Sequence, residues 1–239
     1  MNIHEVEKRK RSGDFQNNTN ISLVNKYVYF AVDKAANSTV KHCLFEIEYR
    51  PVNKTILDIY DPRASPLLSP YQIPQDYFSS IMSGKDFYKF SFVRNPYSRL
   101  LSCYLDRIQT RTSRPSREFR KALGRETFTF SDFVTLVCSQ ASKAQNSHWR
   151  EQSDDILFDL VDFDHIAKFE NLWDEMEFLS KKIFGDVREE MVNKSVNSSP
   201  KQTGSDSKLL EYYDQYLLDM VYDRYSKDFE NFGYEKVVI

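Results

Sequence analysis

The sequence has little glycine and cysteine, and each shortage excludes a class of protein. Only 6 Gly and 8 Pro occur in 239 residues, which excludes a collagenous or low-complexity chain. Cys43, Cys103 and Cys138 are odd in number and form no C-x-x-C pair, so neither a disulfide framework nor a zinc site is indicated. We therefore expect buried reduced thiols and no bound metal.

The sequence also lacks a large net charge and a long apolar run. Its 33 Lys and Arg residues nearly balance 35 Asp and Glu residues, so a net charge of -2 gives no overall attraction for nucleic acid or for an anionic membrane. No apolar run approaches the length that spans a bilayer, and the polar stretch from Met1 to Asn20 has no signal-peptide core. We expect a cytoplasmic protein.

Large apolar side chains, by contrast, are abundant. The 18 Phe and 15 Tyr residues can fill a substantial core. The chain length favours one domain, with two small domains as the alternative. Residues 1–22 contain the runs EKRKR and QNNTN, a composition that predicts a flexible N-terminal arm. The folded domain is then expected over residues 23–239.

Apolar patterning predicts strands that alternate with helices. Buried strands are expected at Tyr27 to Val32, Phe87 to Val93 and His165 to Phe169, with a short strand at Thr55 to Ile59. Helical spacing or capping predicts a helix after Thr39, one from Pro96 to about Ile108, helices at Ser131 to Gln140 and Leu172 to Phe184, and one core helix from Lys208 to Phe229. The basic stretch from Thr110 to Arg125, which Pro115 and Gly124 interrupt, is expected to form an exposed loop or short helix. This order predicts a single-domain α/β fold, P-loop-like and three-layered, with a central parallel sheet flanked by helices.

The turn after the first strand has the composition of an anion site. An open α/β sheet binds ligands at the carboxyl ends of its strands, where Asp33 to Thr39 fall. The N–H groups of Ala36 to Thr39 begin the next helix, the hydroxyls of Ser38 and Thr39 add donors, and Lys34 adds positive charge. The Walker A pattern GxxxxGK[ST] is absent, so an ordinary capped helix start remains an alternative for this turn alone.

A second polar cluster follows the strand that ends at Val93. Asn95 and Pro96 suit the cap and first turn of a helix, and Arg94 and Ser102 lie eight residues apart across this turn. An arginine binds phosphate through paired, charge-assisted hydrogen bonds, and a nearby hydroxyl can complete the contacts. A nucleotide with phosphates at two separate positions needs two such sites.

Both segments resemble the cofactor motifs of the sulfotransferases that use 3′-phosphoadenosine 5′-phosphosulfate (PAPS). Lys34 to Thr39 (KAANST) is similar to their 5′-phosphosulfate loop, and Phe92 to Tyr104 (FVRNPYSRLLSCY) to their 3′-phosphate motif. The second motif resembles the carbohydrate branch, sulfotransferase family 2, with its chondroitin, dermatan and HNK-1 enzymes. Further similarities lie in NSHWREQ (146–152), Lys168-Phe169-Glu170, Asn193-Lys194-Ser195 and YSKDFENFGY (225–234), so the resemblance spans roughly residues 26–234.

The resemblance implies that the protein transfers a sulfonate group from PAPS to a hydroxyl of a carbohydrate-type acceptor, without a metal. It implies that Lys34 contacts the oxygen that bridges the sulfonate and the 5′-phosphate. The 5′-phosphate would contact Ala35, Ala36, Asn37, Ser38 and Thr39, and the 3′-phosphate Arg94 and Ser102, with Lys194 as a further cofactor contact. Eukaryotic relatives are anchored in the Golgi membrane.

The base that deprotonates the acceptor is less closely defined by the sequence. His148 in NSHWREQ is the first candidate, because polar residues surround it and the neighbouring Trp149 offers a surface for sugar stacking. A structural histidine is an equally good interpretation, and His42, Glu46 and Glu48 remain alternatives.

Two residues depart from the family pattern. Asp33 stands where a proline commonly precedes the lysine, which brings a carboxylate to an anion site, and Asn37 stands where a smaller residue is usual. These departures leave open a non-catalytic nucleotide-binding protein with the same fold. A small-molecule kinase is a weaker alternative, because it needs a P-loop lysine followed directly by Ser or Thr.

Overall fold

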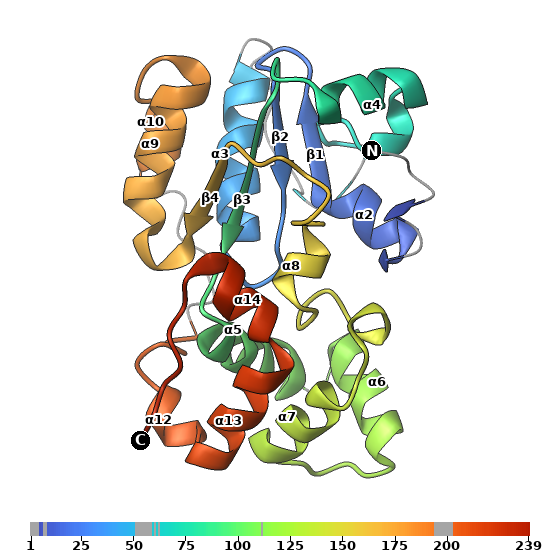
Figure 1. Ribbon diagram of the computed structural model, residues 1–239, viewed down its shortest axis with the longest axis vertical. Helices are drawn as coiled ribbons and strands as arrows, with labels where there is room; N and C mark the ends of the chain where they lie inside the picture. The colour runs from blue at the N-terminus through green and yellow to red at the C-terminus, as the bar shows by residue number, and fades with distance from the viewer. Residues whose placement is uncertain are drawn as a thin grey trace. The chain divides into compact units, whose positions relative to one another are not determined.

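The computed structural model describes residues 5–6, 9–50, 59, 61, 63–110, 112–193 and 203–239 (Figure 1). The chain divides into two compact units. The first comprises Met1–Val93 and Asp154–Pro200, and the second comprises Arg94–Ser153 and Lys201–Ile239. The first unit contains the sheet, whereas the described elements of the second are helical.

The first unit contains a four-stranded sheet in the order β1-β2-β3-β4. Its strands are β1 (Thr19–Ser22), β2 (Tyr27–Phe30), β3 (Tyr88–Val93) and β4 (His165–Lys168). β1 pairs antiparallel with β2, whereas β2, β3 and β4 are parallel. The predicted α/β class with a central sheet flanked by helices is confirmed, and the sheet is mostly parallel, because β1 runs antiparallel to β2. The short strand predicted at Thr55 to Ile59 involves residues 55–58, which lie outside the described part of the chain.

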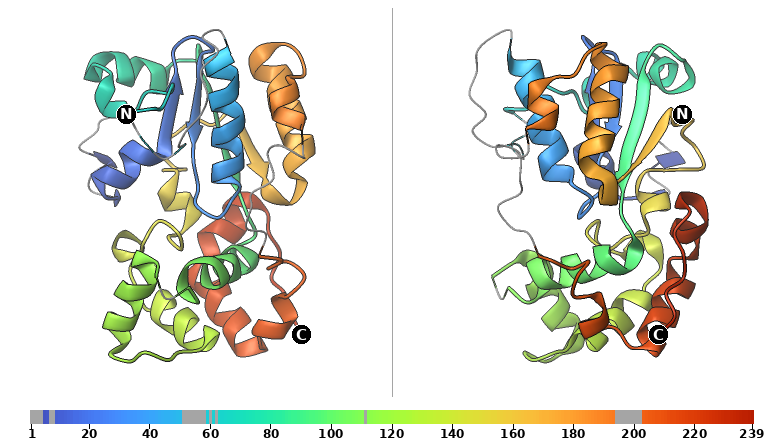
Figure 2. Two further views of the ribbon diagram at one scale, coloured as in Figure 1. Left: turned by 180° about the vertical axis from the view of Figure 1, so that it is seen from behind. Right: turned by 90° about the vertical axis from the view of Figure 1, so that its left-hand side faces the viewer.

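One face of the sheet packs against α3 (Asn37–Tyr49), α9 (Leu172–Phe184) and α10 (Glu189–Val192), as Figure 2 shows. Because side chains alternate along a strand, Tyr27 and Tyr29 of β2 point to this face. They join one apolar cluster with Phe90 and Phe92 of β3. Helix residues complete the cluster, among them Val40, Leu44, Met176, Leu179 and Met191.

The opposite face receives the alternate residues of the same strands. Phe30 of β2 contacts Phe163, with ring centroids 5.2 Å apart. The Ser91 hydroxyl of β3 donates to the carbonyl oxygen of Phe30 at 2.7 Å. The remaining elements of this unit are α2 (Ser12–Asn18), the 3-10 turns η2 (Pro70–Gln72) and η5 (Phe169–Asn171), and α4 (Gln75–Ser83); α8 (Gln152–Asp155) spans the point where the chain passes from the second unit to the first.

The expectation of a flexible arm over residues 1–22 is wrong for residues 12–22. This segment forms α2 and β1, and Phe15 is fully buried with its ring 6.0 Å from that of Phe78. The Lys41 ammonium donates to the carbonyl oxygen of Asn17 at 2.9 Å. The polar composition did not predict this order. The segment is held by backbone pairing of β1 with β2 and by two buried apolar side chains, Phe15 and Ile21.

Phe15→Ala should therefore lower the free energy of unfolding by about 3–5 kcal/mol, the usual cost of deleting a buried aromatic ring. Urea denaturation measures this loss. Asn17→Ala is the matched control on the same helix, because this side chain is exposed and should change stability by less than about 0.5 kcal/mol. Equal effects of the two substitutions would show that residues 12–22 do not contribute to the fold.

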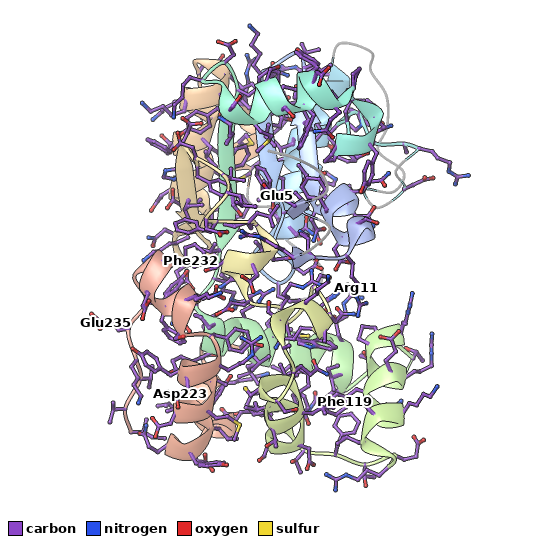
Figure 3. All side chains as sticks on the ribbon, turned by 45° about the vertical axis from the view of Figure 1, so that its right-hand side comes forward. Glu5, Arg11, Phe119, Asp223, Phe232 and Glu235 are labelled. Carbon is purple, nitrogen blue, oxygen red and sulfur yellow. The ribbon has the colours of Figure 1, made fainter. Side chains whose placement is uncertain are left out.

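The second unit packs its helices around one aromatic-rich core. Its helices are α5 (Pro96–Cys103), which continues into the π-helical turn η3 (Tyr104–Ile108), then α6 (Arg114–Leu123), α7 (Phe130–Cys138), the 3-10 turn η4 (Ser142–Ala144), α12 (Leu209–Tyr212), α13 (Gln215–Arg224) and α14 (Ser226–Phe232). Tyr97, Phe133 and Phe229 are buried in this core. Phe119 of α6, labelled in Figure 3, contacts the rings of Phe128 and Phe133.

The single core helix predicted from Lys208 to Phe229 is wrong, because the chain forms α12, α13 and α14 instead. Asp214 adopts an extended conformation, and its carboxylate accepts a hydrogen bond from the Leu217 N–H, which caps α13. Tyr225 interrupts the helix again at φ -108 and ψ 24. The apolar spacing persists through these breaks because all three helices face the same core.

Candidate functional site

The turn between β2 and α3 has an unusual backbone. Residues 33–36 form the turn, and both Lys34 (φ 68) and Ala36 (φ 61) adopt the left-handed conformation. This conformation is unfavourable for residues with a Cβ atom and is found mainly where function or packing imposes it. Turns with left-handed residues can direct successive backbone N–H groups toward one point and form a concave site for anions.

The start of α3 adds further donors to this turn. Ala36 precedes the helix, and no side chain caps it. The first turn of α3 contains no acidic residue, so its positive dipole end is not neutralised by a side chain of that turn. Thr39 is buried within this turn, and Ser38 is half-buried.

The two residues that depart from the family pattern contact each other. The Asn37 Nδ2 donates to the Asp33 Oδ1 at 3.1 Å. Within the described structure, the buried Oδ1 of Asn37 has no hydrogen-bond partner. Asn37 thus holds the Asp33 carboxylate by a hydrogen bond.

A buried lysine lies further along α3. Burial lowers the pKa of Lys41, and the negative charge of Asp33 opposes this shift. Lys41 was not among the residues predicted from the sequence, because a lysine on a helix is usually exposed.

Arg94 begins the second unit and is buried at 5% exposure. Its Nε donates to the Ser98 hydroxyl at 3.2 Å. Its Nη2 donates to the Ser205 hydroxyl at 2.8 Å and forms an ion pair with the Asp206 carboxylate. The predicted cap is present, since the Asn95 side chain accepts a hydrogen bond from the Tyr97 N–H. The guanidinium therefore already contacts one anionic group of the chain.

Ser102 lies on α5 and is also buried. The Thr203 hydroxyl donates to the Ser102 oxygen at 3.2 Å. Arg94 and Ser102, predicted as a pair, thus both contact the segment Thr203–Asp206. Sequence reasoning missed this segment, although its run Thr-Gly-Ser-Asp, with Gly204 in the left-handed conformation at φ 62, is rich in hydroxyl donors.

His148, the predicted base, is half-buried in the second unit. Its Nδ1 lies 2.8 Å from the Asn146 Oδ1, which also accepts the His148 backbone N–H at 3.1 Å. Trp149 does not offer a surface for sugar stacking, because it is buried against Phe133 and its Nε1 donates to Gln140. The expectation that Trp149 stacks on a sugar is therefore wrong.

The alternative bases lie along α3. Glu48 accepts hydrogen bonds from Asn25 and from the Tyr27 hydroxyl. Tyr27 begins β2, so Glu48 lies near the amino end of that strand, whereas the Lys34 turn follows its carboxyl end. The His42 Nε2 lies 4.0 Å from the Glu46 Oε1, and both side chains are half-buried. Lys194, the remaining predicted cofactor contact, lies outside the described residues.

The described structure contains neither a disulfide nor a cluster of candidate metal ligands. All three cysteines are free thiols, and burial raises the pKa of Cys43 and of Cys138 to about 12, which leaves little reactive thiolate at neutral pH. Over the described ranges, no three or more His, Cys, Asp or Glu side chains gather as a metal site. Each helix in the same part of the chain is too short or too polar to cross a bilayer.

A family model matches most of the chain. The model of a family described as "Sulfotransferase family" matches residues 17–235. No curated protein and no solved structure matches the chain. The matched range includes the Lys34 turn, the Arg94 motif and most of both compact units.

Proposed function

Since this chain belongs to the sulfotransferase family, we propose that it transfers a sulfonate group from PAPS to a hydroxyl of a carbohydrate-type acceptor. The observation that carries the proposal is the buried guanidinium of Arg94, which contacts a carboxylate and two serine hydroxyls as it would contact a phosphate. The acceptor class rests on the sequence resemblance to the carbohydrate branch.

We assign the 5′-phosphosulfate end of PAPS to the Lys34 turn. Left-handed residues, an uncapped helix start and the hydroxyls of Ser38 and Thr39 together fit an anion with several oxygens. The Asp33 carboxylate beside this turn accepts a hydrogen bond from Asn37 and interacts with the positive charge of Lys41, which offsets part of its negative charge.

We assign the 3′-phosphate to Arg94 and Ser102, with the hydroxyls of Thr203 and Ser205 as additional donors. The sequence resemblance assigns both segments to one nucleotide. β2 and β3 are parallel neighbours, so the chain leaves both at the same edge of the sheet, toward Lys34 and toward Arg94. In this assignment the phosphate replaces the Asp206 carboxylate on the guanidinium.

Asp206→Asn should therefore tighten the binding of 3′-phosphoadenosine 5′-phosphate (PAP), the product form of PAPS, by about tenfold. The neutral amide competes less well than the carboxylate for Arg94. Isothermal titration calorimetry measures the dissociation constant, and Glu118→Gln, which removes an exposed charge paired with Arg114, is the control. Weaker binding by the Asp206→Asn variant would show that the carboxylate orders the phosphate site instead of competing for it.

The chemistry follows from where charge develops. When bound, PAPS supplies the sulfonate group, and negative charge grows on the oxygen that leaves with the 5′-phosphate. The Lys34 ammonium and the N–H groups of the turn stabilise this charge more in the transition state than in the ground state. His148 takes the proton from the hydroxyl group of the carbohydrate acceptor. A proton on Nδ1, donated to Asn146, leaves Nε2 as the basic nitrogen.

The activity assay incubates the purified chain with PAPS and a panel of glycans and measures released PAP and sulfated product. The proposal predicts product formation that a metal chelator does not reduce. Tight binding of PAP without product formation on any glycan would instead favour the non-catalytic nucleotide-binding alternative. Loss of activity on chelation would favour phosphoryl-transfer chemistry.

A further inference from the structure

The main chain of Arg94 is held by a side chain that lies far away in the sequence. The Arg94 N–H donates to the Gln152 Oε1 at 2.9 Å, and the Gln152 Nε2 donates to the Arg94 carbonyl oxygen at 2.8 Å. Arg94 follows the last residue of β3 and precedes the cap of α5, so it belongs to neither element. The Gln152 amide thus supplies both hydrogen bonds that a buried backbone needs.

Gln152 is in turn held by a buried carboxylate. Asp228 of α14 is fully buried, and its Oδ2 accepts the Gln152 N–H at 2.8 Å and the Gln152 Nε2 at 3.3 Å. Its Oδ1 accepts the N–H and the hydroxyl of Ser153 at 2.7 and 2.8 Å. Four donors around one carboxylate fix the orientation of the glutamine amide.

Maintaining this carboxylate is costly for the fold. Burial raises the pKa of Asp228, while the hydrogen bonds from Gln152 and Ser153 act in the opposite direction. A fully buried carboxylate is seldom retained where an apolar residue would pack equally well. The cost therefore suggests that Asp228 has a role besides filling space.

We propose that Gln152 and Asp228 are positioning residues that aim the Arg94 guanidinium at the 3′-phosphate of the nucleotide. Both ends of Arg94 are then fixed. Gln152 holds its main chain, while Ser98 and Ser205 hold its guanidinium. A cation fixed in this way binds phosphate without first losing conformational freedom. This inference rests on the proposed function, and it adds residues that touch neither the nucleotide nor the acceptor.

The test compares two nucleotides that differ only in the 3′-phosphate. Gln152→Met removes both hydrogen bonds to Arg94 at similar side-chain volume, and Asp228→Asn removes the charge that orients Gln152. For each variant, the dissociation constants of PAP and of adenosine 5′-phosphate are measured by calorimetry. We expect the affinity for PAP to fall about ten- to a hundredfold, while that for adenosine 5′-phosphate stays within about twofold.

The matched control is Gln145→Met. Gln145 is also fully buried in the second unit, but its amide contacts the Val137 carbonyl oxygen and Arg224 instead of Arg94. This control should lose thermal stability and keep the wild-type preference for PAP. A purely structural role for Gln152 and Asp228 predicts the same behaviour for all three variants.

Each outcome separates this inference from the proposed function. If the wild-type protein prefers PAP and the Gln152→Met and Asp228→Asn variants retain that preference, the positioning role is wrong and the proposed function stands. If the wild-type protein binds PAP no better than adenosine 5′-phosphate, the assignment of Arg94 to the 3′-phosphate is wrong, and the positioning role is overturned with it. Should Gln152→Met fail to fold, Ser153→Ala, which removes one donor from Asp228, provides the same comparison.

Discussion

Arg94→Ala should raise the dissociation constant of PAP at least about a hundredfold, toward that of adenosine 5′-phosphate. The substitution removes a buried cation whose fork of N–H groups can bind phosphate through paired, charge-assisted hydrogen bonds. We assign Arg94, Ser102, Thr203 and Ser205 to the 3′-phosphate. Of these four residues, Arg94 alone carries a positive charge. Calorimetric titration with PAP measures the effect.

Arg94→Lys is the informative companion to this variant. It keeps the positive charge but loses the planar fork, so we expect its PAP affinity to lie between those of the wild-type protein and the Arg94→Ala variant. Binding of adenosine 5′-phosphate should change little in either variant, because this nucleotide lacks the 3′-phosphate. An unchanged dissociation constant of PAP after the Arg94→Ala substitution would refute the assignment.

Lys34→Ala should lower kcat about a hundredfold or more while changing the affinity for PAP much less. We assign Lys34 to the bridging oxygen, where charge appears only as the sulfonate leaves, so its loss should affect the transition state more than the ground state. Initial rates at saturating PAPS give kcat. PAP lacks the sulfonate, so its dissociation constant reports the remaining phosphate contacts.

Lys26→Ala is the control for this substitution. Lys26 is likewise a lysine in the left-handed conformation, at φ 50, but it lies in the turn before β2, at the other end of that strand. Both substitutions have the same effect on local backbone preference, so a difference in kcat isolates the chemistry of Lys34. Equal kcat in the Lys34→Ala and Lys26→Ala variants would contradict the catalytic role.

Local signals in the sequence predicted the elements that position the candidate site. β2 and β3 were expected within one or two residues of their observed ends, because buried parallel strands form continuous apolar runs. α9 begins and ends at the predicted residues Leu172 and Phe184. The Asn95 cap and Pro96 likewise predicted the start of α5 correctly. Each of these predictions depends on residues that are neighbours in the sequence.

The features that the sequence did not reveal depend on distant contacts. Thr203 and Ser205 reach Ser102 and Arg94 across about a hundred residues, and no local pattern links these positions. Gln152 stood within a segment recognised by resemblance, but its contact with Arg94 follows only from the fold. The burial of Phe15 was hidden for the same reason, since its partner Phe78 follows much later in the chain.

A calorimetric titration of the wild-type protein with PAP, adenosine 5′-phosphate and adenosine 3′-phosphate tests whether one nucleotide occupies both phosphate sites. If the Lys34 turn and the Arg94 site bind the two phosphates of one nucleotide, PAP will bind with one molecule per chain and much more tightly than either monophosphate. Equal affinities for the three nucleotides, or two molecules of PAP per chain, would show that the two sites do not bind one nucleotide together.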